Sequence, residues 1–185
     1  MPDHILFNGA DRLPTDCFRE VFMNKPVLLI AGALLAASVS PLSARDSASE
    51  AFLKKAIEGN YAEIRMGELA QTGGQSDAVK AFGKMLATDH AAANQKALDA
   101  AKALGMTPPT AQNDRQASDL DTMSKMRGAK FDRVFANHMV SDHKKDIAAY
   151  KKEAKVKDAG GDYASGQLPT LQKHLDTATA LKAGK

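Results

Sequence analysis

The chain has 185 residues, a net charge of +3 at pH 7, a single cysteine and no tryptophan. This length is enough for one domain with a proper core. Lysine and arginine are spread among acidic residues, so the composition does not indicate a nucleic-acid-binding protein. Aromatic residues make up only 5% of the chain, and alanine is abundant. This balance favours packed helices over a β-sandwich.

Residues 1–44 are predicted to be an N-terminal extension followed by a secretory signal peptide, with Met23 as the expected start. Lys25 supplies a positive charge, Val27–Val39 is an uncharged apolar run, and Ala44 ends a plausible cleavage site. The run is shorter than the roughly 20 residues that span a membrane. We therefore predict cleavage after Ala44 and a periplasmic or secreted domain without a membrane span. An uncleaved membrane anchor is the alternative.

The mature domain is predicted to cover residues 45–185. The only cysteine, Cys17, lies in the N-terminal extension. The mature domain would therefore contain neither a disulfide nor a thiol nucleophile.

Two long amphipathic helices are predicted in the first half of this domain, because apolar residues recur there every three or four positions. The first runs from about Asp46 to Gln71, and Gly73-Gly74 should end it. Ser76 is a suitable N-cap for the second helix, which runs from Asp77 to about Leu104.

The second half of the domain is predicted to contain one short and two long helices. Ser118 is expected to cap the short helix, over 118–126, and the third long helix covers about 130–157. Gly160-Gly161 should break the chain before a fourth long helix over 162–182. Because Pro169 falls inside that range, this helix either kinks there or begins near the proline.

These elements predict an all-α fold, a ferritin-like four-helix bundle. The connection between the second and third long helices spans about 25 residues, including the short helix, and could cross the full length of a bundle, as in ferritin-like folds. An up-down-up-down arrangement would not need so long a connection.

Six ionisable residues are predicted to lie at nearly one height in the bundle core. An Asp-His pair occurs twice, near the middle of the second and third long helices, each time with a phenylalanine eight residues before the histidine. With a rise of about 1.5 Å per residue, a glutamate of the first helix and a histidine of the fourth fall close to the same height. The set is Glu63, Asp89, His90, Asp142, His143 and His174.

Two interpretations of this layer stay open. Imidazole and carboxylate groups in a bundle core suit zinc, iron, manganese or copper, and each aspartate could orient a neighbouring ring. Alternatively, the same groups form a buried hydrogen-bond network without metal. The Glu-x-x-His pattern of di-iron bundles is absent, so ferritin-type iron oxidation is not supported.

The segments Phe52–Glu63, Gly67–Ala70, Val79–Phe82 and Leu168–Leu175, together with the two Asp-His pairs, resemble a family of secreted bacterial proteins. That family is known as domain of unknown function 4142 and is often labelled "predicted outer membrane protein". The resemblance covers nearly the whole mature chain and implies a ferritin-like four-helix bundle. It also implies that the family's pattern keeps Glu63, His90, His143, His174 and the two aspartates.

Two functions of different classes follow from these patterns. One is a periplasmic bundle that binds a transition metal, either a stress-related metal handler or a weak oxidoreductase. The other is a non-catalytic structural or interaction module of the cell envelope. The sequence leaves enzyme activity open and favours a non-catalytic role, because no nucleophile or phosphate-binding loop is present.

Overall fold

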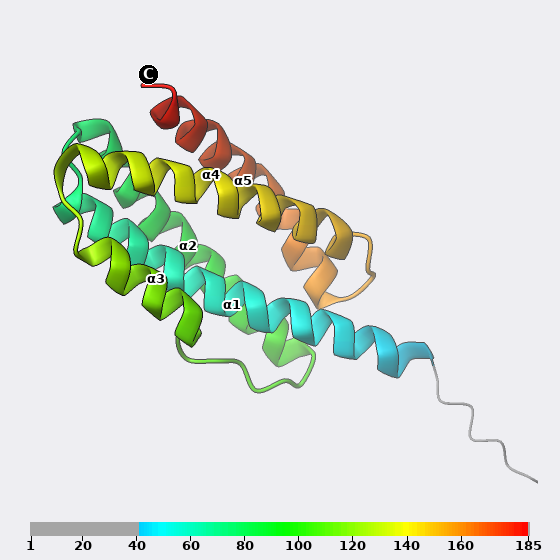
Figure 1. Cartoon of the computed structure of the whole chain (residues 1–185). Coiled ribbons are helices and arrows are strands. Elements are labelled where there is room, and N and C mark those ends of the chain that lie inside the picture. The colour runs from blue at the N-terminus through cyan, green and yellow to red at the C-terminus, as the bar shows by residue number, and fades with distance from the viewer. Residues whose placement is uncertain (1–40, 185) are drawn as a thin grey trace, which may run out of the picture. The chain divides into compact units, whose positions relative to one another are not determined.

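The computed structural model describes residues 41–184, which form five helices and no strand (Figure 1). The helices are α1 (Pro41–Gly73), α2 (Asp77–Ala103), α3 (Asp114–Ser124), α4 (Gly128–Glu153) and α5 (Ala159–Lys182). The predicted all-α bundle is confirmed. The expected start at Met23 lies outside the described residues, and the expected cleavage after Ala44 falls within α1 and stays a prediction. In residues 41–184, no helix is long and apolar enough to cross a membrane.

Contacts at the two ends of the bundle fix the directions of the helices. The Ser49 hydroxyl, in the first half of α1, donates to Glu153 at the end of α4 over 2.6 Å. At the opposite end, the N–H groups of Gln75 and Ser76 donate to the carboxylate of Asp132, near the start of α4. Helices α1 and α4 are therefore antiparallel, and α2 and α4 run in the same direction. The chain returns between α2 and α4 through α3, which lies beside α1 (Figure 1).

Two predicted helix starts are corrected by the capping residues. The short helix begins at Asp114 and not near Ser118, because Asn113 forms a capping box with Gln116. The fourth long helix begins at Ala159, because the Asp158 side chain accepts a hydrogen bond from a backbone N–H of its first turn.

Gly160-Gly161 was expected to break the chain but lies within α5. A Cβ atom on Gly161 would collide with the carbonyl oxygen of Val156. The glycine is therefore needed for a tight approach of the chain and does not end a helix. Helix α5 continues through Pro169, which excludes a start at the proline. Helix α4 ends at Glu153 and not near residue 157.

Helices α1 and α2 approach closely at a pair of glycines. A Cβ atom on Gly67 would lie 2.5 Å from the carbonyl oxygen of Gly83, and one on Gly83 would lie 2.6 Å from the carbonyl oxygen of Gly67. Such distances exclude any side chain on either residue without a shift of the backbone. The close crossing brings the two helices together about two turns away from His90 along α2.

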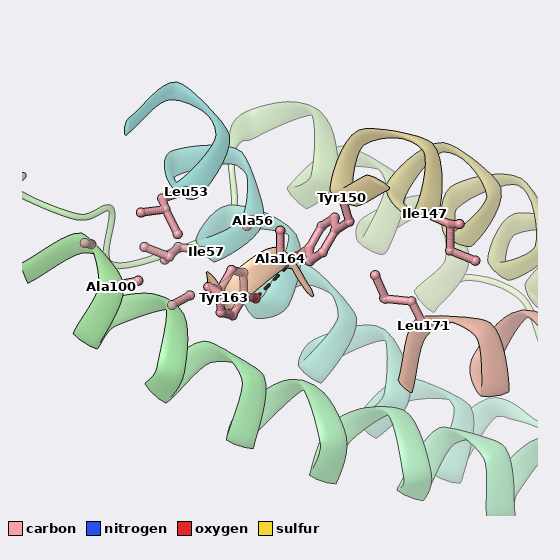
Figure 2. Packing of buried hydrophobic residues seen from close by; sticks show 11 residues of the cluster. Leu53, Ala56, Ile57, Ala100, Ile147, Tyr150, Tyr163, Ala164 and Leu171 are labelled. Carbon is pink, nitrogen blue, oxygen red and sulfur yellow. Dashed lines mark hydrogen bonds between the residues drawn. The ribbon is translucent and has the colours of Figure 1, made fainter. Parts of the chain in front are cut away.

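The core consists of two apolar clusters with a polar layer between them. One cluster includes Leu53, Ile57 and Tyr163 (Figure 2). The other includes Phe82 and Phe135. Along each long helix, buried polar residues fall between the positions that contribute to the two clusters: Asn60 and Glu63 on α1, His90 and Asn94 on α2, His143 on α4 and His174 on α5. The candidate functional residues are therefore held between two packed apolar layers.

Candidate metal centre

Three histidines from three helices meet in the buried polar layer. His90 lies on α2, His143 on α4 and His174 on α5, and all three side chains are buried. One nitrogen atom of each lies within 4.8 Å of the nitrogens of the other two. The ring centroids are 5.2 to 5.9 Å apart. The predicted convergence of these histidines is therefore observed in the structure.

The hydrogen bond of His143 determines which of its nitrogens carries the proton. Its Nδ1 lies 3.0 Å from the carbonyl oxygen of Met139, one turn earlier in α4. Because a carbonyl oxygen can only accept, Nδ1 must donate its proton. In the neutral ring, Nε2 then presents a lone pair to the centre of the layer.

His90 is oriented in the same way by an amide. Its Nδ1 lies 2.9 Å from Oδ1 of Asn60, while Nδ2 of Asn60 donates to the hydroxyl of Tyr163 over 3.1 Å. With Oδ1 as the acceptor, Nδ1 of His90 carries the proton. Nε2 of His90 is then a bare lone pair, which is buried and has no hydrogen-bond partner among the described residues. Such an orphaned nitrogen requires an explanation.

His174 completes the pattern with the opposite ring nitrogen. Its Nε2 lies 2.9 Å from Oδ2 of Asp89 and donates to that carboxylate. Its Nδ1 lies 3.3 Å from Nε2 of His143. In a neutral ring that donates to Asp89, Nδ1 has no proton. Two lone pairs then face each other, which is unfavourable unless a cation lies between them.

Burial keeps these rings neutral. Desolvation, and to a lesser extent the neighbouring His174, lowers the pKa of His143 to about 4. Burial also lowers the pKa of His90 well below its usual range, with added effects of the other two histidines. It lowers the pKa of His174 as well, although the Asp89 carboxylate opposes the shift. At neutral pH all three are imidazoles, which is the form that binds metal ions.

The predicted carboxylates have three different positions. Asp89 accepts from His174, as a residue that orients a ring. Asp142 has His138 and Lys145 as its partners, at 3.1 and 3.3 Å. The third carboxylate, Glu63, is outside the group of mutually close ligand atoms.

Glu63 is nevertheless an unusual carboxylate. It is buried, and its Oε2 has no hydrogen-bond partner among the described residues. Burial raises its pKa well above its usual range, and the charges of Asp146 and Asp142 raise it further. Glu63 therefore keeps its proton to a higher pH than an exposed glutamate does.

Sequence reasoning missed Asn60 and Tyr163. Asn60 occupies an inward position of the first helix, three residues before Glu63, so its position could have indicated it. The hydrogen bonds from His90 through Asn60 to Tyr163 continue to Tyr150, whose hydroxyl oxygen lies 3.3 Å from that of Tyr163 (Figure 2). These residues hold the amide of Asn60, and through it the ring of His90.

A small pocket adjoins His90 between α2 and α5. Its lining includes Asn60, Asp89, Gln167 and Thr170, and it has room for about one water molecule. The partly exposed Asp89 lies in its wall. The pocket therefore places the partly exposed Asp89 and the ring of His90 around the same small space.

The fold and the site define a class: an all-α helical bundle with a buried trio of neutral histidines that could hold a metal ion. The chain belongs to the family described as Domain of unknown function (DUF4142), whose sequence model matches residues 34–181. No curated protein and no solved structure matches the chain. The relation to ferritin-like proteins therefore stays a prediction.

Proposed function

We propose that the protein binds one transition-metal ion, most favourably zinc, through Nε2 of His90, Nε2 of His143 and Nδ1 of His174. One observation carries the proposal. The other nitrogen of each ring donates to an oxygen atom, so that three lone pairs are turned toward one region. This is the outer-shell pattern of metal-binding histidines. Three histidines and an open fourth position form a well-known zinc ligand set.

The distance between two of the nitrogens supports this ligand set. Two nitrogens that are each about 2.0–2.1 Å from a tetrahedral zinc ion are about 3.3–3.4 Å apart. His143 Nε2 and His174 Nδ1 are 3.3 Å apart. The pair already has the separation of two zinc ligands.

The second candidate function is a structural module with a buried hydrogen-bond network and no metal. That network needs a cationic histidine at the contact between His143 and His174: either His174, which would donate to Asp89 and His143, or His143, which would donate to Met139 and His174. Burial disfavours either cation, since it lowers the pKa of His174 and also that of His143. The network also leaves Nε2 of His90 buried without a partner, which costs about 1–3 kcal/mol. A metal ion removes both difficulties.

We further propose that the protein holds or transfers its metal outside the cytoplasm and does not act as an enzyme. The signal-like sequence before Ala44 supports export. The burial of all three histidines and the narrow pocket beside His90 support a site that retains an ion. Such a pocket excludes substrates larger than water-sized molecules.

Metal titration of the purified, metal-free full chain tests the proposal. We expect one zinc ion per chain, bound more tightly than about micromolar, and a higher melting temperature in the loaded protein. His90→Ala and His143→Ala should each abolish both effects. His138→Ala is the control, because His138 lies on α4 but pairs with Asp142. Parallel titrations with iron(II), manganese(II) and copper would identify the preferred ion.

The result that favours the network is equally clear. If none of these ions binds more tightly than about micromolar, about −8 kcal/mol, and none shifts the melting temperature, the structural module is the better account.

A further inference from the structure

One face of α4 is positively charged. All the exposed charged residues of this helix are cationic: Lys130, Arg133, Lys144, Lys145, Lys151 and Lys152. They recur at spacings that place them on the solvent side of the helix, opposite the buried positions such as Phe135, Met139 and His143. We call these six residues the basic face.

The acidic residues of α4 lie outside the basic face, and none of them is as exposed as its cations. Asp132 accepts hydrogen bonds from backbone N–H groups of the α1–α2 connection. Glu153 accepts from Ser49 of α1. Asp142 is about one-third exposed and neutralises only Lys145 on the basic face, at 3.3 Å. Asp146 is half-buried, and burial raises its pKa to about 7.

The other helices do not show this segregation. In the described part of the chain, each of them exposes charges of both signs. The exposed residues are Lys54, Lys55, Arg65 and Glu68 on α1; Asp77, Lys84, Lys96, Asp99 and Lys102 on α2; Asp114, Arg115 and Asp121 on α3; and Asp162, Lys173, Asp176 and Lys182 on α5. The single sign on α4 is thus a property of one face, although the chain as a whole has a net charge of only +3.

We propose that the basic face binds the surface of a membrane rich in anionic lipid. With 26 residues, α4 is about 39 Å long, and its cations are distributed from the first turn to the last, so the face can contact several phosphates of a planar surface at once. Five of the six cations are lysines, which act as point charges and do not select one phosphate geometry. Each Lys or Arg near such a surface adds attraction.

The uncharged residues of the same face indicate how deep the protein binds. The exposed positions between the cations are Asn137, Ser141, Ala148 and Ala149. They offer no large apolar side chain for insertion into the acyl region. They also offer no aromatic ring on which nucleic-acid bases stack. The face therefore fits lipid headgroups at the membrane surface, bound reversibly and by charge.

Vesicle sedimentation with the full chain tests this inference. Binding to phosphatidylcholine vesicles is compared with binding to vesicles that also contain phosphatidylglycerol. We expect preferential binding to the anionic vesicles at about 0.1 M salt and loss of that preference at about 1 M, because the screening length falls from about 10 Å to about 3 Å. Sedimentation with the neutral vesicles measures any affinity that residues outside α4 contribute.

Charge reversal on two helices provides the matched comparison. Lys144→Glu/Lys151→Glu/Lys152→Glu should weaken binding to anionic vesicles more than about tenfold, since each cation near the surface contributes separately. Lys84→Glu/Lys96→Glu/Lys102→Glu on α2 changes the net charge equally and should have a much smaller effect. If the α4 charge reversal alters the circular dichroism spectrum, the test is repeated with the same three lysines changed to glutamine.

Three outcomes would overturn the proposal. They are equal binding to neutral and anionic vesicles, equal losses in the α2 and α4 variants, and tight binding to soluble polyphosphate or duplex DNA without binding to anionic vesicles. None of these measurements involves a metal ion, so the inference stands or fails independently of the proposed metal centre.

Discussion

Nε2 of His143 and Nδ1 of His174 lie 3.3 Å apart, on helices that form one antiparallel hairpin. The other nitrogen of each ring donates a hydrogen bond, in His143 to the carbonyl oxygen of Met139 and in His174 to Asp89. These two proposed ligands would therefore already be in place before a metal ion binds. His90 completes the group from α2, and closing the remaining gap should draw α2 toward the other two helices.

The two Asp-His pairs are alike in sequence but should differ in function. Asp89→Ala removes the acceptor that orients His174, so zinc affinity should fall about ten- to a hundredfold. Asp142→Ala should change it by far less, because Asp142 pairs with His138 and Lys145. The side chains are 30% and 34% exposed, which makes the variants well matched. Competition titration with a zinc chelator measures both. Equal losses would show that Asp89 has no orienting role.

Asn60 should control the tautomer of His90. Asn60→Leu removes the acceptor for Nδ1–H of His90, and zinc affinity should fall by about tenfold or more. Asn60→Asp keeps an oxygen at this position and should retain most of the affinity. With cobalt(II) in place of zinc, the visible spectrum should change in the leucine variant and be nearly unchanged in the aspartate variant. Unaltered affinity in Asn60→Leu would contradict the assignment of the ligand nitrogens.

Asp146→Asn should stabilise the protein, and only at higher pH. The pKa of Asp146 rises from 3.8 to about 7, first because of burial and then because of Asp142. Since the folded-state pKa is the higher one, its stabilising effect is present below about pH 4 and is lost as pH rises through about 7. The asparagine variant avoids that loss.

We therefore expect Asp146→Asn to gain about 1–2 kcal/mol at pH 8, a value reduced for solvent screening at this partly exposed position. The gain should vanish near pH 4. Urea unfolding of both metal-free proteins across this range measures it, and a gain that is constant with pH would refute the explanation.

The glycine crossing of α1 and α2 should be intolerant of any side chain. Gly67→Ala would place Cβ 2.5 Å from a carbonyl oxygen of α2, and overpacking of this kind costs about 1–3 kcal/mol. Gly59→Ala, two turns earlier in α1, meets no atom within 4 Å. It should stabilise by about 0.5–1 kcal/mol through higher helix propensity. Thermal unfolding compares the two, and a stabilised Gly67→Ala protein would show that the helices can separate without loss.

The periodicity of apolar residues was sufficient to predict the long helices, because every one of them buries a single stripe. The same stripes placed His90, His143 and His174 at one height. The rotation of each helix about its axis could not be predicted, since neighbouring helices set it. That rotation turns Asp89 toward His174 but leaves Asp142 at the edge of α4, with His138 and Lys145 as partners.

The other missed features depend on local backbone geometry or on neutral groups. Asn113 and Ser118 are equally suitable helix caps by residue type, and only the capping box distinguishes them. Gly160-Gly161 was read as a break because glycine often ends helices, whereas here it allows the chain to approach Val156. Asn60 carries no charge and was therefore passed over among titratable residues.

The four long helices form two local hairpins, α1–α2 and α4–α5, and α2 and α4 run in the same direction. Each hairpin consists of two long helices that follow each other in the sequence. His90 comes from the first hairpin, and His143 and His174 come from the second. Neither hairpin alone holds all three ligands. During folding, the complete set of proposed ligands can come together only after the two hairpins have docked, so we expect tight metal binding to be a late event that reports complete assembly. A chain whose hairpins separate transiently would release its ion at the same moment.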